Sequence, residues 1–401
     1  MLTTLGMPWP EVMQWLRRWE RRYYYADYAE AALRQQWLDS PTGLPVEEVR
    51  VPMFFPREST RTIVVFKPDD IGDTVQALPA LWELRKALPE AKITVLAQEK
   101  ATPIFEKTAV ADSVLPIRAK SRLRRFPKIE ELPLERFDLG IFLRTHPSYF
   151  HAYRKLNCER FLHPQDPRMR SSSPYQVYAN EWGERGEHQA LQMLRIVSPL
   201  TGKKYGRSDI AYPRWNWSEP EMREARKFVD IERPYLVLHP HVRDETRRYP
   251  KEYWANLVQK IAARFEVRLF SIGAKGESEK YFDDSVGSLE GKLGLASTAY
   301  LLSRAAGVIG VSSGPSHIAS ALGTPTITLL GGGASYVREW APLGKSLVVR
   351  SEIACAPCNL TACPGNNLQC LTELTPERVF PSVEKFLLAH GAPLTGKKTL
   401  H

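Results

Sequence analysis

The chain contains two glycine turns whose residue types could move a proton or bind phosphate. The first turn covers residues 67–75 and follows an apolar run, and the second covers residues 310–317 and follows another. A turn that leads from a strand into a helix gathers free backbone N–H groups and the positive end of the helix dipole at one place. We therefore expect two α/β halves that face one cleft, with a carboxylate on one side and hydrogen-bond donors on the other.

Asp73 is the candidate proton acceptor of the first turn. It falls in the first turn of a helix that we predict as far as Leu88, where the helix dipole favours an ionised carboxylate. Gly72 beside it would let a ligand or another backbone segment approach closely. An aspartate at this position can also be an ordinary helix cap, and Asp69 and Asp70 could cap in its place.

Two features farther along the chain could bind phosphate groups. Arg247 and Arg248 follow a predicted strand, and a guanidinium can donate two parallel hydrogen bonds to phosphate oxygens. The alternative is a surface loop in which these arginines pair with neighbouring acidic residues. The second glycine turn adds hydroxyl, backbone N–H and imidazole donors at a helix start, from Ser312, Ser313, Gly314 and His317.

Four cysteines near the C-terminus have the spacing of a metal site. They are Cys355, Cys358, Cys363 and Cys370, separated by two, four and six residues. Zinc and iron accept four thiolates, and a site closed by four thiolates leaves no open position for catalysis. We expect a structural zinc or iron in a knuckle over residues 355–370, with free thiols or a disulfide as alternatives.

The charge of the chain favours an anionic partner. The 401 residues carry a net charge of +10, with a pI near 9.3. A concentrated basic stretch is either a solvated loop or a binding surface for the acidic groups of a substrate. It contains Arg118, Lys120, Arg122, Arg124 and Arg125.

The apolar pattern predicts alternating strands and helices in both halves of the chain. In the first half, strands over residues 63–66 and 93–97 flank a helix over 75–88, and another strand covers 139–143. The second half has strands over 235–239, 267–271, 308–311 and 326–329, with helices over 251–264, 298–306 and up to Ala321. This alternation predicts doubly wound parallel sheets, whose ligands lie beyond the carboxyl ends of the strands.

We predict three regions: a helical N-terminal extension over residues 1–60, and Rossmann-like domains over 61–212 and 213–401. The extension has Val12, Trp15, Trp19 and Tyr23 at helical spacing among arginines, which suits either an anionic membrane surface or packing against protein. No apolar run has the length of a membrane span, and the N-terminus lacks the apolar core of a signal peptide. We expect a cytoplasmic protein that could contact the inner membrane peripherally.

Taken in order, the motifs resemble those of glycosyltransferase family 9, the lipopolysaccharide heptosyltransferases. The resemblance runs from about residue 62 to about residue 388. It rests on Gly72 and Asp73 followed by residues 77–81, on 246–250, on Gly273 with Glu277, on 313–319 with 321–325, and on the cysteine knuckle leading into 374–379.

The resemblance implies a GT-B fold and an inverting transfer that needs no catalytic metal. The donor would be ADP-L-glycero-D-manno-heptose, bound by residues 213–401, and the acceptor would be the lipopolysaccharide inner core, bound by residues 61–212. Asp73 would be the general base, and Arg247 would contact the donor phosphates where the family usually has a lysine. Glu277, or Glu279 in the alternative register, would lie near the ribose or the base.

Two departures from the family pattern bear on the substrate. Ser312 stands where the family usually has an aspartate that touches the sugar hydroxyls, so the sugar is less constrained than the fold. The extension and the cysteine knuckle also resemble a subgroup that transfers heptose to serines of autotransporter proteins and forms large assemblies around an iron-binding cysteine finger. The basic stretch of residues 118–125 favours the lipid acceptor, because Kdo carboxylates and phosphates are acidic.

Two other classes fit less well. A nucleotide- or nucleic-acid-binding module without enzymatic activity would agree with the pI. Aromatic and basic residues are interleaved near residues 15–25, but the remaining chain has no compact nucleic-acid motif. An NAD-dependent oxidoreductase would need a G-x-G-x-x-G turn after the first strand, and residues 67–73 lack it. We therefore expect a nucleotide sugar, and no nucleic acid, as the ligand.

Overall fold

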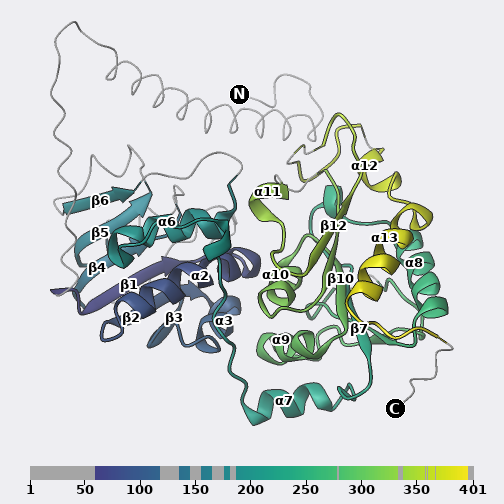
Figure 1. Ribbon diagram of the computed structural model, residues 1–401, viewed down its shortest axis with the longest axis horizontal. Coiled ribbons are helices and arrows are strands. Elements are labelled where there is room, and N and C mark those ends of the chain that lie inside the picture. Colours follow the sequence, from purple (N-terminus) through teal and green to yellow (C-terminus); the bar gives the residue numbers. More distant parts are fainter. Residues whose placement is uncertain are drawn as a thin grey trace, which may run out of the picture. The chain divides into compact units, whose positions relative to one another are not determined.

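Two six-stranded parallel sheets organise the described part of the chain (Figure 1). The order in the N-terminal sheet is β3-β2-β1-β4-β5-β6, and in the C-terminal sheet it is β12-β11-β10-β7-β8-β9. Counted in chain order within each sheet, both give the Rossmann arrangement 3-2-1-4-5-6. The predicted α/β class, with two doubly wound Rossmann-like sheets, is confirmed.

The computed structural model describes residues 59–117, 135–144, 155–164, 176–180, 187–277, 280–332, 337–356, 358, 360–365 and 367–395. All of them belong to the unit Phe55–His401. The predicted helical extension apart from residues 59 and 60, the basic stretch of residues 118–125 and Glu279 lie outside the described residues. None of the described helices is both long and apolar enough to span a bilayer.

The strands of the N-terminal sheet are β1 (Thr62–Lys67), β2 (Lys92–Gln98), β3 (Ser113–Ile117), β4 (Phe137–Phe142), β5 (Cys158–Pro164) and β6 (Gln176–Asn180). Those of the C-terminal sheet are β7 (Tyr235–His239), β8 (Arg268–Ser271), β9 (Gly287–Ser288), β10 (Gly307–Val311), β11 (Thr326–Leu330) and β12 (Ser346–Arg350). The sequence analysis did not predict β3, β5, β6, β9 and β12. All of these except β5 lie at sheet edges, and the half-exposed residues of β3 and β12 give a weak apolar signal.

The helices of the N-terminal half are α2 (Ile71–Ala87), α3 (Thr102–Glu106) and α6 (Gln189–Thr201). Those of the C-terminal half are α7 (Glu219–Arg226), α8 (Lys251–Arg264), α9 (Leu295–Arg304), α10 (Gly314–Ala321), α11 (Val337–Trp340), α12 (Gln369–Thr372) and α13 (Pro376–Ala389). Helix α8 has the predicted bounds, whereas α2 begins at Ile71 and not at Val75. Gly72 was interpreted as part of the turn, but it lies inside the first helical turn.

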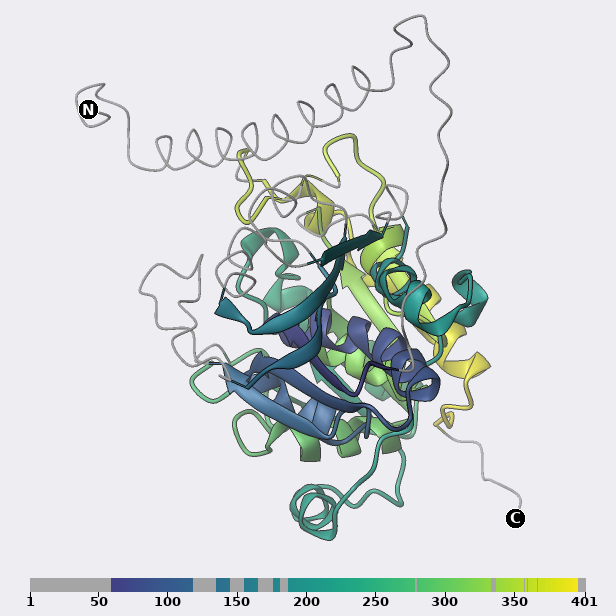
Figure 2. The same cartoon turned by 90° about the vertical axis from the view of Figure 1, so that its left-hand side faces the viewer.

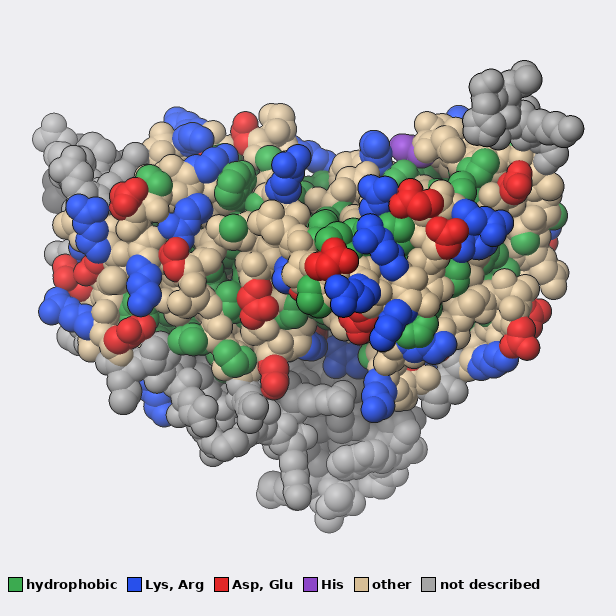
Figure 3. Space-filling view, turned by 90° about the horizontal axis from the view of Figure 1, so that it is seen from below, with side chains coloured by type: hydrophobic (Ala, Val, Ile, Leu, Met, Phe, Trp, Pro, Cys, Tyr) green, Lys and Arg blue, Asp and Glu red, His purple; other side chains and the backbone are tan. Residues whose placement is uncertain are grey.

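We call the N-terminal sheet with α2, α3 and α6 the N-terminal lobe, and the C-terminal sheet with α7 to α13 the C-terminal lobe. The predicted boundary at residue 212 lies in the segment between α6 and α7. In the view of Figure 2 the strands of the N-terminal sheet lie side by side. On the face shown in Figure 3, Lys and Arg side chains are interspersed with Asp and Glu, so this face does not carry charge of a single sign.

Alternating residues of the central strands pack on opposite faces of each sheet. In β1, Ile63 and Val65 belong to one buried cluster and the intervening Val64 to another. In β7, Val237 joins the same cluster as Ile63, while Leu238 packs on the other face of its sheet. Each fully buried Val, Ile or Leu side chain contributes about 1.5–3 kcal/mol. One apolar cluster therefore runs through both lobes and holds the strand ends that carry the site.

Candidate active site

A cleft of about 790 Å³ lies between the two lobes, at the carboxyl ends of the central strands. This volume is typical of a pocket for a small ligand. The predicted site residues that line it are Asp73, Arg247, Glu277, Ser312, Ser313, Gly314 and His317. Arg248 is exposed and is not among the lining residues. The fold thus brings together seven residues that the sequence analysis placed in two separate turns and two loops.

The two glycine turns meet in the cleft. Helix α2 follows the first turn, α10 follows the second, and the two helices contact each other. A Cβ added to Gly314 would lie 2.7 Å from Ile71 Cγ2, and one added to Gly72 would lie 2.9 Å from His317 Cδ2. Only glycine permits this approach. As a result, the N-termini of both helices open into the same cleft, where their dipoles favour negative charge.

Replacing Gly314 with alanine should push the two turns apart. The added methyl group would meet the branched carbon atoms of Ile71, which cannot bend away as the end of a long side chain could. We expect kcat/KM to fall by roughly 10- to 100-fold, since a misplacement of about 1 Å can cost about 100-fold. Steady-state kinetics measure this. Gly206→Ala is the matched control, because its methyl group would meet no atom closer than 3.6 Å. Equal activity of the two variants would contradict the tight contact.

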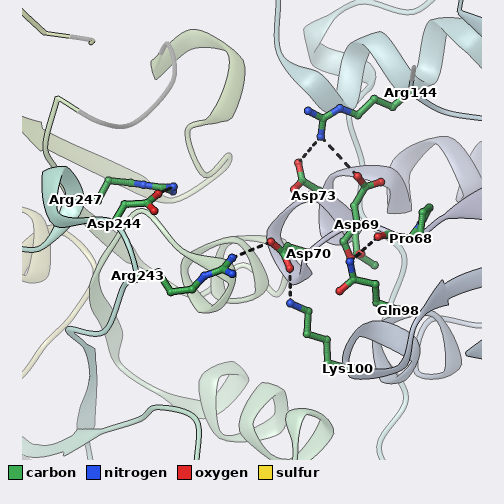
Figure 4. Close-up of polar contacts among 11 residues, drawn as sticks. Pro68, Asp69, Asp70, Asp73, Gln98, Lys100, Arg144, Arg243, Asp244 and Arg247 are labelled. Atoms are coloured by element: carbon green, nitrogen blue, oxygen red, sulfur yellow. Dashed lines mark hydrogen bonds and ion pairs between the residues drawn. The ribbon is translucent and has the colours of Figure 1, made fainter. Parts of the chain in front are cut away.

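Asp69 and Asp70 are both paired with cations (Figure 4). Lys67 Nζ donates to Asp69 Oδ2 at 2.6 Å, and the Lys67 side chain is completely buried. Asp70 pairs with Lys100 and, across the cleft, with Arg243, whose Nη2 lies 3.3 Å from Asp70 Oδ2. The Asp70 carboxylate is about half exposed, so water screens its charge.

Asp73 lies in the first turn of α2, as the sequence predicted. Its side chain is 23% exposed, and Arg144 Nη1 lies 3.4 Å from Asp73 Oδ1. Burial raises the pKa of the Asp73 carboxyl, the Arg144 charge lowers it in part, and the negative charge of Asp69 raises it further. A carboxylate with a raised pKa is a better acceptor for a hydroxyl proton. Asp73 is therefore a carboxylate of raised proton affinity in the wall of the cleft.

The sequence analysis did not single out Arg144. This residue follows β4, which pairs in parallel with β1, so it emerges beside the first glycine turn. Its guanidinium also lies 5.8 Å from the ring of Trp340, in α11 of the C-terminal lobe. The available signal was a charged residue directly after a predicted central strand, since parallel strands end at the same edge of a sheet.

Arg247 reaches the cleft from a short 3-10 turn, Glu245–Arg247, that follows β7. It forms an ion pair with Asp244, as the alternative interpretation of this loop proposed (Figure 4). Its buried Nε atom has no hydrogen-bond partner among the described residues. An unpartnered buried donor is costly unless a ligand satisfies it. Arg247 is thus both paired and available to an anion in the cleft.

Two histidines at the end of β7 line the C-terminal wall of the cleft, and the sequence analysis missed both. His239 Nδ1 lies 2.9 Å from Ser313 Oγ, and burial lowers the pKa of His239 to about 3. His241 Nε2 lies 2.9 Å from Glu290 Oε1 and its Nδ1 lies 3.7 Å from Glu277 Oε2. A neutral His239 therefore orients Ser313, and His241 links two carboxylates.

Glu277 is held at the rim of the same wall. Its Oε2 accepts a hydrogen bond of 2.8 Å from the backbone N–H of Ala274. A Cβ on Gly273 would collide with the same carboxylate and with the His241 ring. The side chain of Glu277 is 35% exposed, so a ligand can reach it from the cleft.

His317 lines the cleft as a neutral side chain. Burial lowers its pKa to about 4, and His188 nearby contributes to this. Its Nδ1 lies 2.9 Å from the amide Nε2 of Gln76, while the Tyr212 hydroxyl donates to Gln76 Oε1 at 3.2 Å. Because the amide nitrogen donates, Nδ1 accepts and Nε2 carries the proton. His317 can offer a hydrogen bond to a phosphate but no positive charge.

Apolar side chains complete the C-terminal wall. Ile272, Leu289, Leu293 and Leu295 line the cleft near the carboxyl end of β8 and the start of α9. A flat aromatic group such as a nucleobase fits apolar surroundings of this kind. These residues were not predicted, because apolar residues in a sequence do not reveal whether they face a core or a pocket.

Two of the four predicted metal ligands approach the same place, beside Gly332. A Cβ on Gly332 would lie 3.3 Å from Cys370 Sγ and 3.6 Å from Cys358 Sγ. None of the four described knuckle cysteines, which also include Cys355 and Cys363, forms a disulfide. Among the residues that the structure describes, no three Cys, His, Asp or Glu side chains are placed to hold a metal ion. The metal site remains a prediction.

Two Rossmann-like lobes with a cleft at their strand ends form a fold of the GT-B type. The model of glycosyltransferase family 9 (heptosyltransferase) matches residues 166–368. The chain belongs to this family and is a glycosyltransferase.

Similar proteins that match this chain over most of its length agree with this assignment. Lipopolysaccharide heptosyltransferase 1 of Pseudomonas aeruginosa is 24% identical, and the match covers 82% of this chain and 98% of that protein. The solved family 9 glycosyltransferase of Veillonella parvula has a TM-score of 0.66 at 18% identity, covering 82% of this chain and 97% of that one. The Escherichia coli heptosyltransferase WaaC with ADP has a TM-score of 0.60 at 18% identity, covering 81% and 99%. These two structures show a shared fold.

Proposed function

We propose that the protein transfers heptose from ADP-L-glycero-D-manno-heptose to the inner core of lipopolysaccharide, with Asp73 as the general base. One observation carries the proposal. A carboxylate with a raised pKa lies in a cleft whose opposite wall offers Arg247 and the N-terminus of α10. The name of the Pseudomonas aeruginosa relative supports a heptose donor and a lipopolysaccharide acceptor.

The C-terminal wall suits an ADP-sugar. The apolar side chains around Leu289 would contact the adenine, and Glu277 would accept hydrogen bonds from ribose hydroxyls. Arg247 and the free N–H groups at the start of α10 would bind the diphosphate. The Escherichia coli heptosyltransferase of similar fold was solved with ADP, which supports this assignment.

The chemistry follows from the position of Asp73. As the acceptor oxygen attacks the anomeric carbon, its proton passes to the Asp73 carboxylate. The new oxygen–carbon bond forms as the bond between the anomeric carbon and the ADP oxygen breaks, which inverts the configuration. Negative charge then grows on the departing ADP, and Arg247 and the α10 dipole stabilise it. Each group thus acts on charge that develops in the transition state.

The environments of the three aspartates favour Asp73 over its neighbours as the base. Asp69 is paired with a buried lysine, and Asp70 is exposed and paired with two cations. The Asp73 carboxyl has a raised pKa, and the cation beside it, Arg144, lies 3.4 Å away.

The proposed acceptor rests on the charge of a basic stretch whose structure is not described. Arg118, Lys120, Arg122, Arg124 and Arg125 would bind the carboxylates and phosphates of a Kdo-lipid acceptor. A protein acceptor is the second candidate, and it is not favoured, because the Pseudomonas aeruginosa relative is named for lipopolysaccharide. A cytoplasmic location, with the N-terminal extension on the inner membrane, also remains a prediction.

The first experiment measures ADP release from ADP-heptose with a heptose-deficient Kdo-lipid A acceptor. We expect release that depends on the acceptor. A serine-containing autotransporter fragment serves as the competing acceptor. Release with the fragment alone would overturn the lipid acceptor, and ADP binding without release would keep the donor site and overturn the proposed sugar or acceptor.

We also propose a structural zinc or iron at the cysteine knuckle. The convergence of the Cys358 and Cys370 thiols beside Gly332 supports it, because thiolates bind these metals. Protein purified under reducing conditions should contain about one metal ion per chain, as metal analysis would measure. Cys358→Ser should lose the metal and lower the melting temperature. Cys158→Ser is the matched control for the metal content, because Cys158 lies in an apolar cluster of the N-terminal lobe and is not part of the knuckle. Wild-type protein without metal would contradict the proposal.

A further inference from the structure

Asp69 is anchored by a buried cation that the proposed mechanism does not use. The Lys67 side chain is completely buried at the end of β1, and its Nζ lies 2.6 Å from Asp69 Oδ2. An isolated buried ammonium is costly, so this pair cannot separate readily. The Gln98 amide also donates to the Pro68 carbonyl at 2.6 Å, next to Asp69 in the chain. The Asp69 carboxylate therefore has a fixed position.

The second oxygen of Asp69 shares a guanidinium nitrogen with the proposed base. Arg144 Nη1 lies 3.6 Å from Asp69 Oδ1 and 3.4 Å from Asp73 Oδ1 (Figure 4). Charge-assisted hydrogen bonds between such groups are usually about 2.7–2.9 Å long. The guanidinium is thus held between the two carboxylates, without a short bond from this nitrogen to either.

Helix capping does not explain the direction of the Asp69 side chain. The N-cap of α2 is Asp70, and no side-chain hydrogen bond caps this helix. The Asp69 carboxylate points instead at Lys67 and Arg144, with one oxygen near each cation. Its contacts are those of a group that places a cation beside the base.

We propose that Asp69 is a positioning residue of the transfer reaction. Fixed by Lys67, it holds Arg144 away from a full ion pair with Asp73 and so keeps Asp73 able to accept a proton. Arg144 then remains close enough to orient the base, while its charge is divided between two carboxylates. This inference rests on the proposed role of Asp73.

Among the described residues, the other groups around Asp73 do not provide this control. Asp70 also faces Asp73, but its charge is offset by Lys100 and Arg243, and His317 on the opposing helix is neutral. The ring of Trp340 lies 5.8 Å from the Arg144 guanidinium and carries no charge. Of these described groups, Asp69 is therefore the anion that competes with Asp73 for Arg144.

The test is the pH dependence of kcat/KM in Asp69→Asn. Without its competitor, Arg144 should form a short ion pair with Asp73, because the neutral amide no longer attracts the guanidinium. An opposite charge at such a distance lowers a carboxyl pKa by about 1–3 units. We expect the acidic limb to move to lower pH by about 1 unit or more, and the plateau rate to fall roughly 10-fold because the base is weaker. An unmoved limb would overturn the proposal.

A second variant is needed because Asp69→Asn leaves Lys67 buried without its counter-ion and could misfold. Combining Lys67→Met with Asp69→Asn removes both charges and should still move the limb to lower pH, but by less than Asp69→Asn alone, because the Lys67 charge also lowers the pKa of Asp73. In an Arg144→Met background, Asp69→Asn should shift the limb by clearly less, because no guanidinium remains to be released. An equal shift in that background would show that Asp69 acts on Asp73 directly and would overturn the role through Arg144.

A direct titration separates this inference from the proposed function. Carbon-13 NMR of labelled aspartates, with the Asp73 signal assigned by its loss in Asp73→Asn, reports the pKa without turnover. A lower Asp73 pKa in Asp69→Asn is expected even if the natural donor or acceptor differs from the one proposed. An unchanged Asp73 pKa would overturn the positioning role even if the wild-type protein transfers heptose.

Discussion

Replacing Asp73 with asparagine should abolish acceptor-dependent ADP release, with kcat lowered by about 100- to 10,000-fold, the usual contribution of a general base. Asparagine keeps the size of the side chain but cannot accept the proton of the acceptor hydroxyl. Donor affinity should change little, because the proposed donor contacts come from the C-terminal wall. Turnover assays and calorimetry with ADP would measure the two effects separately.

The matched control for this variant is Asp70→Asn. Asp70 belongs to the same turn, but it is about half exposed and paired with Lys100 and Arg243. We expect its loss to lower kcat far less than the loss of Asp73. If Asp73→Asn kept wild-type turnover, the base would lie elsewhere, and Asp69 and Asp70 would be the next candidates.

The Asp73→Asn substitution should not unfold the protein. The pKa of Asp73 is raised in the folded state, so the folded chain binds this proton more tightly than the unfolded chain does. As the pH rises above the ordinary pKa of an aspartate, the unfolded chain loses this proton more readily than the folded chain does. The free energy of unfolding therefore falls as the pH rises. At pH 7 a neutral asparagine removes this cost, and we expect an equal or higher melting temperature. A marked drop in the melting temperature would show that the Asp73 charge stabilises the fold.

Replacing Arg247 with glutamine should weaken donor binding and lower the rate together. The guanidinium faces the cleft and its Nε has no hydrogen-bond partner among the described residues. A hydrogen bond to a charged group contributes about 1.5–3 kcal/mol, which corresponds to roughly 10- to 100-fold in affinity. The decrease in kcat should be similar, because charge grows on the departing ADP.

Calorimetry with ADP and steady-state kinetics would test this role. Arg247→Lys keeps the charge without the planar fork and should recover part of the loss. Arg248→Gln is the neighbouring comparison, and we expect a smaller effect, because Arg248 is exposed and does not line the cleft. Unchanged ADP affinity in Arg247→Gln would refute a phosphate contact.

Most of the fold could be predicted because its strands and helices have strong local patterns. The central strands β1, β7 and β10 are almost fully buried, and their apolar runs predicted them directly. The edge strands β3 and β12 were not predicted, because their residues are partly exposed and give a weak apolar pattern. The placement of Asp73 in a first helical turn followed from local rules and is confirmed.

The candidate site also has features that the local sequence predicted and features that only the tertiary structure revealed. The sequence by itself determined the family, the two glycine turns and the residues that each turn offers, because these depend on neighbours along the chain. Only the tertiary structure placed Arg144 beside Asp73, anchored Asp69 on the buried Lys67 and showed His317 to be neutral. It also left Arg248 outside the cleft lining. Proton affinity and ion pairing depend on burial and on charges from distant segments, and no local pattern in a sequence encodes them.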